Sequence, residues 1–234
     1  MAIRVRPSYI AGTREPAMAT KLRIDFVSDV ACPWCVVGLR SLKAALDKVG
    51  ADVEADIHFQ PFELNPDMPP EGENTTEHVQ KKYGSTAERS AAARNAIREA
   101  GANFGFDFNY NSESRIWNTF DAHRLLHWAG LEGRQLELKE ALFAANFTQQ
   151  KSTSDHAVLI EAARAAGLDA GRASEILASD LYVAEVRAEQ SLWRNRGINA
   201  VPSVIFNGRW MVQGGQPPQV FEQAIRQIVA GTAT

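Results

Sequence analysis

Residues 21–50, KLRIDFVSDVACPWCVVGLRSLKAALDKVG, decide the fold, because a strand-like run, two cysteines and a helical pattern follow one another directly. The run 21–28 mixes β-branched and large apolar residues over the length of a strand. After it, apolar residues recur at steps of four and three, which is one face of an amphipathic helix. The members of this face are Cys35, Leu39, Leu42, Leu46 and Val49. The sequence therefore predicts a buried strand whose end delivers Cys32 to the start of a helix.

Cys32 and Cys35 are the two cysteines of the chain, and they hold different places in this pattern. Pro33 suits the first helical position, where its missing N–H would have had no partner, so Cys32 lies at or just before the N-cap. Cys35 continues the apolar face of the helix. We therefore expect Cys32 to be the exposed sulfur and Cys35 to be the shielded one.

The start of a helix favours the thiolate form of Cys32, because unpaired N–H groups and the positive end of the helix dipole lie there. Cys32 is the predicted nucleophile. Cys35 can then attack a mixed disulfide formed on Cys32 and release the partner, which leaves a Cys32–Cys35 disulfide. This pair of roles defines a thiol–disulfide oxidoreductase.

A structural zinc site and an inert pair of core cysteines are two competing interpretations. A tetrahedral zinc site needs two more ligands, and the chain has no second Cys-X-X-Cys. His123 and His127 are spaced i,i+4, but they lie roughly 90 residues downstream rather than at the spacing of a zinc finger. Pro33 and the start of the helix favour a reactive pair over an inert one.

The second informative stretch is residues 197–218, GINAVPSVIFNGRWMVQGGQPP. Two strand-like runs, 203–206 and 209–212, are separated only by Asn207-Gly208, which predicts an antiparallel hairpin. Pro202 stands directly before the first run, where a residue without an N–H fits, and the sequence leaves its peptide isomer open. A helix with one apolar face follows the two prolines.

The remaining elements complete an α/β architecture. Residues 53–60 alternate between apolar and polar, which predicts a second strand parallel to the first in a right-handed βαβ unit. A large all-helical insertion then separates this βαβ unit from the C-terminal ββα unit. We expect a disordered N-terminal tail over 1–20, one α/β domain formed by 21–64 and 181–232, and an inserted helical domain over 65–180.

Charge and composition limit the partners. A formal charge of −3 shows no basic surplus, so nucleic acid and anionic membranes are poor candidates. No segment is long and apolar enough for a transmembrane span, and residues 1–20 lack the apolar core of a secretory signal. We expect a cytoplasmic protein, and in that compartment a lone Cys-X-X-Cys favours catalysis over a structural bond.

The order of these elements resembles the DsbA-like branch of the thioredoxin fold over residues 21–230. Three stretches are similar to the FrnE-like subgroup of that family, namely 28–35 (SDVACPWC), 62–66 (FELNP) and 118–124 (NTFDAHR). The resemblance implies a thioredoxin fold and dithiol–disulfide exchange with protein thiols or disulfides, or with small thiols. We further expect a monomer or homodimer that binds no metal and no cofactor, with glutathione as an optional co-substrate.

The resemblance further implies a substrate surface formed by Pro33, Trp34, Val201 and Pro202. Val201–Pro202 is expected to be the cis-proline of the family, held against the two sulfurs. The backbone of Val201 is then expected to pair with an extended substrate lying over Cys32, while the helical block forms a lid.

Two departures from the family bear on the chemistry. Trp34 stands where strongly oxidising relatives have histidine, and Phe26 stands where many thioredoxin-fold enzymes bury an acid. Both predict a milder redox poise and leave the acceptor of the Cys35 proton open. Two alternatives also stay open. The first is a glutathione-dependent isomerase or transferase of the kappa-like type (2-hydroxychromene-2-carboxylate isomerase), whose members carry serine in place of Cys32. The second is a non-catalytic peptide-binding chaperone module.

Overall fold

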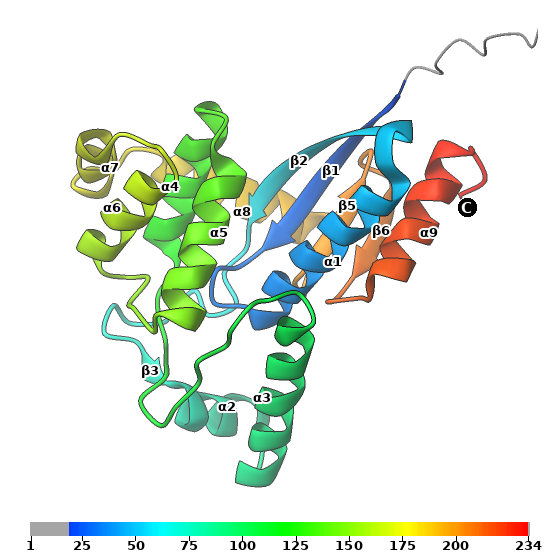
Figure 1. The fold of residues 1–234 in the computed structure, drawn as a ribbon. Coiled ribbons are helices and arrows are strands. Elements are labelled where there is room, and N and C mark those ends of the chain that lie inside the picture. The colour runs from blue at the N-terminus through cyan, green and yellow to red at the C-terminus, as the bar shows by residue number, and fades with distance from the viewer. Residues whose placement is uncertain (1–18, 234) are drawn as a thin grey trace, which may run out of the picture.

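The computed structural model describes residues 19–233, built on a four-stranded sheet of order β2-β1-β5-β6 (Figure 1). Strand β1 (Thr20–Ser28) pairs in parallel with β2 (Val53–Pro61). On its other side β1 pairs antiparallel with β5 (Ser203–Phe206), which forms a hairpin with β6 (Trp210–Gln213). Most of the predicted tail, residues 1–18, lies outside the described part, and Thr20 already belongs to β1.

Strand β1 is central because both of its faces are covered. Leu22, Ile24 and Phe26 pack with helices α1 (Pro33–Val49) and α9 (Pro218–Val229), which lie together on one face of the sheet (Figure 1). Val27 instead packs with Trp193, on the face that α8 (Val183–Asn195) covers. A strand buried on both sides reads as a nearly continuous apolar run, as residues 21–28 do.

The predicted motif helix is confirmed in its details. Helix α1 begins at Pro33 with Cys32 as its N-cap residue, and the chain leaves it at Gly50. Gly50 has a φ of 66°, which is a left-handed conformation that glycine adopts without steric penalty.

A large helical segment lies between β2 and β5, which confirms the predicted α/β class with a helical insertion. Helices α4 to α7 share a second apolar core of their own. The division into domains stays a prediction. The segment comprises β3 (Glu73–Asn74), α2 (Thr75–Tyr83), α3 (Ala87–Ala102), β4 (Arg115–Ile116), α4 (Phe120–Leu131), α5 (Gln135–Phe143), a π-helical turn (Ala144–Thr148), α6 (His156–Ala165), α7 (Ala170–Leu177) and α8 (Val183–Asn195).

The insertion is fixed to the free edge of the sheet through side chains. Gln135, at the start of α5, accepts a hydrogen bond from the Phe59 N–H at 2.8 Å and donates one to the Phe59 carbonyl at 3.0 Å. Its amide thus takes the place of a neighbouring strand along β2. Lys43 of α1 also pairs with Glu140 of α5 at 2.7 Å. As a result α5 lies beside both β2 and α1.

Candidate functional site

The turn between β1 and α1 is held by Asp29. Its Oδ2 accepts a hydrogen bond from the Leu64 N–H at 2.7 Å, and its Oδ1 accepts one from the Ala31 N–H at 3.2 Å. His123 Nε2 lies 3.6 Å from the same carboxylate. Burial by itself would raise the pKa of Asp29, but His123 and the two amides outweigh it, so the pKa lies below its ordinary value. Asp29 is therefore an ionised anchor for the loop that carries Cys32.

Replacing Asp29 with alanine is expected to lower the free energy of unfolding by about 2–4 kcal/mol, because two partly buried amides lose their acceptor. Urea unfolding measures this, with the exposed Asp67→Ala as a control that leaves stability nearly unchanged. Folding lowers the pKa of Asp29, so the ionised carboxylate contributes to the free energy of unfolding. This contribution is complete above the ordinary pKa of 3.8 and is lost as the pH falls through the folded-state pKa. A stability difference that stayed constant below that pH would contradict the ionised anchor.

The two sulfurs lie where the helix begins. The Cys32 N–H donates to the Asp29 carbonyl at 3.2 Å, and the Cys35 N–H donates to the Cys32 carbonyl at 3.1 Å. Cys32 is 4% exposed and Cys35 is 0% exposed, both as free thiols. The expected order of exposure holds, but the expectation of an open Cys32 is wrong. The reason is that the segment before Pro202 covers it, with the Cys32 thiol 3.6 Å from the Val201 carbonyl oxygen.

Burial raises the pKa of Cys35 well above its ordinary value. A hydrogen bond to Cys32 and the charge of Cys32 raise it further, while Lys139 and the backbone of Asp29 act in the opposite direction. Cys35 is therefore the sulfur that is held as a thiol. This arrangement suits a resolving cysteine that loses its proton only when it is used.

The other predicted site residues surround the pair from two sides. The Val201–Pro202 peptide bond is cis. Pro202 is buried against α1, where a Cβ added at Gly38 would lie 3.0 Å from the proline Cγ. Trp34 is 39% exposed and lies against Gly215, where an added Cβ would come within 2.9 Å of its ring. Glycine at both positions leaves room for these close approaches. Pro33 is half-buried, and the contact of these residues with substrate stays a prediction.

Lys139 is the functional candidate that the sequence reasoning missed. Its side chain projects from α5 into the interior, is 0% exposed, and its Nζ has no hydrogen-bond partner among the described residues. Nζ lies 5.0 Å from the centre of the Phe143 ring and 5.8 Å from that of Phe59. Burial lowers the pKa of Lys139 to about 8, whereas the charges of Cys35, Asp29 and Cys32 hold it up. A buried cation is therefore placed behind the resolving cysteine.

One signal in the sequence could have found Lys139. It stands four residues before Phe143 and three after Leu136, so it shares the apolar side of its helix. A lone lysine on the apolar side of a helix either extends its ammonium group to solvent or buries that group at a functional site. The choice between them depends on what covers the helix.

The predicted histidine pair serves other contacts. His123 Nε2 lies 3.1 Å from the Phe62 carbonyl oxygen, and His127 pairs with Glu189 at 3.2 Å. Within residues 19–233 no group of three or more Cys, His, Asp or Glu side chains is arranged to hold a metal ion. In the same described range, no helix combines the length and apolar character that crossing a bilayer requires.

A Cys-X-X-Cys pair at the N-terminus of a helix on this sheet defines a protein of the thioredoxin-like class. The family model for the DSBA-like thioredoxin domain matches residues 23–226, and the chain belongs to this family. The predicted family is thereby confirmed, while its FrnE-like subgroup stays a prediction.

Individual relatives agree with this assignment. The chain is 26% identical over 205 residues to the uncharacterized protein YwbO of Bacillus subtilis, covering 87% of this chain and 96% of YwbO. A crystal structure of a probable DsbA oxidoreductase from Streptomyces coelicolor is 31% identical, with a TM-score of 0.85 over 91% of this chain and 92% of that chain.

Two more distant structures share the fold alone. The cytosolic disulfide reductase DsbM from Pseudomonas aeruginosa, solved with GSH, is 14% identical with a TM-score of 0.60, over 89% of this chain and 99% of that chain. A 2-hydroxychromene-2-carboxylate isomerase is 12% identical with a TM-score of 0.64, over 91% of this chain and 100% of that chain.

Proposed function

We propose that this protein is a dithiol–disulfide oxidoreductase in which Cys32 attacks and Cys35 resolves. The observation that carries the proposal is the unequal setting of two adjacent sulfurs. Cys32 occupies the N-cap of α1 beneath the Val201 carbonyl, while Cys35 is wholly enclosed and is held as a thiol. Protein thiols and disulfides, or small thiols such as glutathione, are the proposed substrates.

The exchange balances without an external cofactor. The Cys32 thiolate displaces one half of a substrate disulfide as a thiolate and forms a mixed disulfide. Cys35 then attacks Cys32, the second half of the substrate leaves as a thiolate, and the Cys32–Cys35 disulfide forms. Two electrons pass from the protein to the substrate, and the proton of Cys35 finishes on a leaving thiolate. The reverse sequence oxidises a substrate dithiol.

Lys139 supports the second step in this proposal. Cys35 must become a thiolate in an apolar interior, which is unfavourable without an opposite charge nearby. The ammonium of Lys139 supplies that charge from behind, and Lys139 lowers the pKa of Cys35. Lys139 thus supplies a buried charge near the pair, whereas the buried Phe26 carries none. It is a positioning residue, since it acts through Cys35.

A small cavity next to Lys139 provides a route by which its ammonium group exchanges a proton with solvent. The cavity has a volume of about 10 Å³, which is about the space that one water molecule occupies. His123, His127 and Glu189 line it together with Lys139. His127 and Glu189 are both partly exposed and pair with each other. In the proposed cycle, Lys139 loses or regains its proton here when the charge on Cys35 disappears or returns.

Equilibration with glutathione buffers tests the proposed function. The reduced and oxidised forms are separated by alkylation and mass spectrometry, and we expect one reversible transition in which the protein loses two hydrogens. The midpoint is expected between about −270 mV and −120 mV, the values for a reductant and a strong oxidant of this fold. A protein that stays reduced in every buffer, or that forms only glutathione adducts, would show that Cys32 and Cys35 do not cycle.

The glutathione-dependent isomerase remains the second candidate. It is supported by the shared fold alone, and such an enzyme needs no resolving thiol. A Cys35→Ser variant that kept full turnover with a glutathione-dependent substrate would favour it. A chaperone module would instead keep its activity on unfolded proteins in Cys32→Ser. The proposed cytoplasmic location is supported by the similarity of this chain's fold to that of the cytosolic DsbM.

A further inference from the structure

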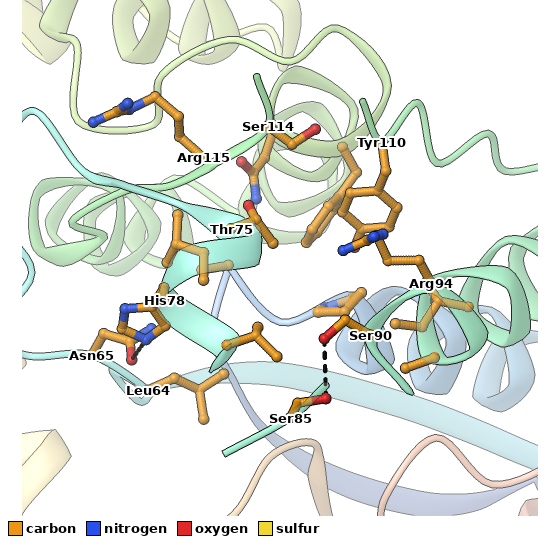
Figure 2. A pocket seen from close by; sticks show the side chains of 18 of the residues that line it. Leu64, Asn65, Thr75, His78, Ser85, Ser90, Arg94, Tyr110, Ser114 and Arg115 are labelled. Carbon is orange, nitrogen blue, oxygen red and sulfur yellow. Dashed lines mark hydrogen bonds between the residues drawn. The ribbon is translucent and has the colours of Figure 1, made fainter. Parts of the chain in front are cut away.

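A cavity of about 220 Å³ lies beside the reactive pair, between the Cys32 loop and helices α2 and α3 (Figure 2). Ala31 and Pro33, the two neighbours of Cys32 in the chain, line one side of it. Most of its wall is apolar, which suits the hydrophobic body of a small ligand. The apolar lining comes from Leu64, Val79, Ala93, Ile97, Ile116 and Phe147.

Three basic residues line this cavity, and two of them are already engaged. His78 lies 2.5 Å from Glu73 and 3.0 Å from Asn65, through its two ring nitrogens. Arg115 donates to two backbone carbonyls, at 3.0 and 2.7 Å. Arg94 makes one hydrogen bond, to the Thr76 hydroxyl at 3.3 Å, and no ion pair with any residue in 19–233. Its guanidinium is therefore the group left to receive an anion.

Tyr110 lines the same cavity as Arg94. In Figure 2 the Arg94 side chain reaches toward the Tyr110 ring. Burial raises the pKa of the Tyr110 phenol, the charge of Cys32 adds to the rise, and Arg98 and Arg94 oppose it. Tyr110 is therefore within electrostatic reach of both Cys32 and Arg94. Its hydroxyl makes no hydrogen bond within the described part of the chain, so it is free to donate one to a ligand.

We propose that this cavity selects small disulfides and thiols that have an apolar body and a carboxylate, with the carboxylate on Arg94 and the sulfur against Cys32. This inference rests on the proposed function and names its substrate class. The volume suits one half of an aromatic or short aliphatic disulfide, and a guanidinium without an ion-pair partner disfavours molecules with a net positive charge. The Cys32 thiolate displaces the half outside the cavity. Cys35 then releases the bound half as a carboxylate-bearing thiol, and the two electrons go to the substrate.

The test uses three disulfides with the full-length protein. Dithiobis(nitrobenzoic acid) is aromatic and carries carboxylates, dithiodipyridine is aromatic and uncharged, and hydroxyethyl disulfide is small and uncharged. Arg94→Gln is expected to slow the reaction with the first compound about ten-fold, because a charge-assisted contact is lost, and to leave the other two within about two-fold. Arg89→Gln is the matched control. It removes the same charge from the same helix at an exposed position outside the cavity.

A second variant tests the cavity itself. Ala93→Phe places a ring at the cavity wall and is expected to slow both aromatic disulfides while hydroxyethyl disulfide reacts as before. The proposal is overturned if Arg94→Gln and Arg89→Gln behave alike, if Arg94→Gln slows all three compounds equally, or if Ala93→Phe does not distinguish them. Failure of the proposed function looks different, because the wild-type protein would then release at most one thiolate per disulfide and keep the other half as a mixed disulfide, without forming the Cys32–Cys35 disulfide.

Discussion

Replacing Cys32 with serine is expected to lower disulfide exchange by at least about 1000-fold, because the remaining thiol is enclosed and is a poor nucleophile as a thiol. The structure supports this asymmetry, since Cys35 is 0% exposed and has a pKa well above its ordinary value. Turnover with a disulfide-bonded peptide and a thiol reductant measures the effect.

Cys35→Ser provides the matched control for this experiment. It removes the same kind of atom one helical turn away, yet we expect the first step to survive and a stable mixed disulfide to accumulate on the protein. Cys32→Ser is expected to form no such adduct. Equal trapping by both variants would mean that the two sulfurs are interchangeable, which would contradict the assigned roles.

Lys139→Met is expected to slow the resolving step about ten-fold to one hundred-fold, because the Cys35 thiolate loses its nearby positive charge. The mixed disulfide with a peptide should then persist, and the step should need a higher pH than in the wild type. This pH shift separates a charge effect from general damage to the fold. Lys151→Met, which removes a half-exposed lysine, is expected to change neither the rate nor its pH dependence.

Lys139→Met is also expected to make the protein more stable. A folded-state pKa of about 8, against 10.5 for a free lysine, means that the buried ammonium lowers stability by about 3 kcal/mol near pH 7. Between pH 8 and 10.5 the folded form has lost the proton while the unfolded chain still holds it, so wild-type stability rises there. Denaturant unfolding of Lys139→Met should therefore show a gain of about 1–3 kcal/mol at pH 7 that shrinks above pH 8. Lower stability at pH 7 would contradict an unfavourable buried charge.

The fold could be predicted from the sequence wherever local patterns decide it. The strand before Cys32, the helix after Pro33 and the hairpin at Asn207-Gly208 each follow from periodicity or turn chemistry, and all three are confirmed. The hairpin loop is one residue longer than predicted, because Phe206 pairs with Trp210 and the second strand begins at Trp210 rather than at 209. Within this loop Asn207 and Gly208 have φ values of 50° and 67°. Such features depend on neighbours in the chain, which the sequence displays directly.

The features that could not be predicted depend on contacts between distant segments. Cys32 is covered by Val201, which stands 169 positions further along the chain. Lys139 is buried because Gln135 fixes α5 to the edge of β2. Helix α5 changes to a π-helical turn at Ala144, within which Asn146 donates to the Val30 carbonyl at 3.1 Å. Periodicity shows that these residues are helical, but it does not show which segment they face.

Brief labelling of the reduced wild-type protein with iodoacetamide, followed by mass mapping, tests the different roles of the two cysteines most directly. At neutral pH we expect label on Cys32 at least about ten-fold faster than on Cys35, because only Cys32 has both a helix N-terminus and a residual opening to solvent. Equal and slow labelling of both residues, or faster labelling of Cys35, would contradict the account.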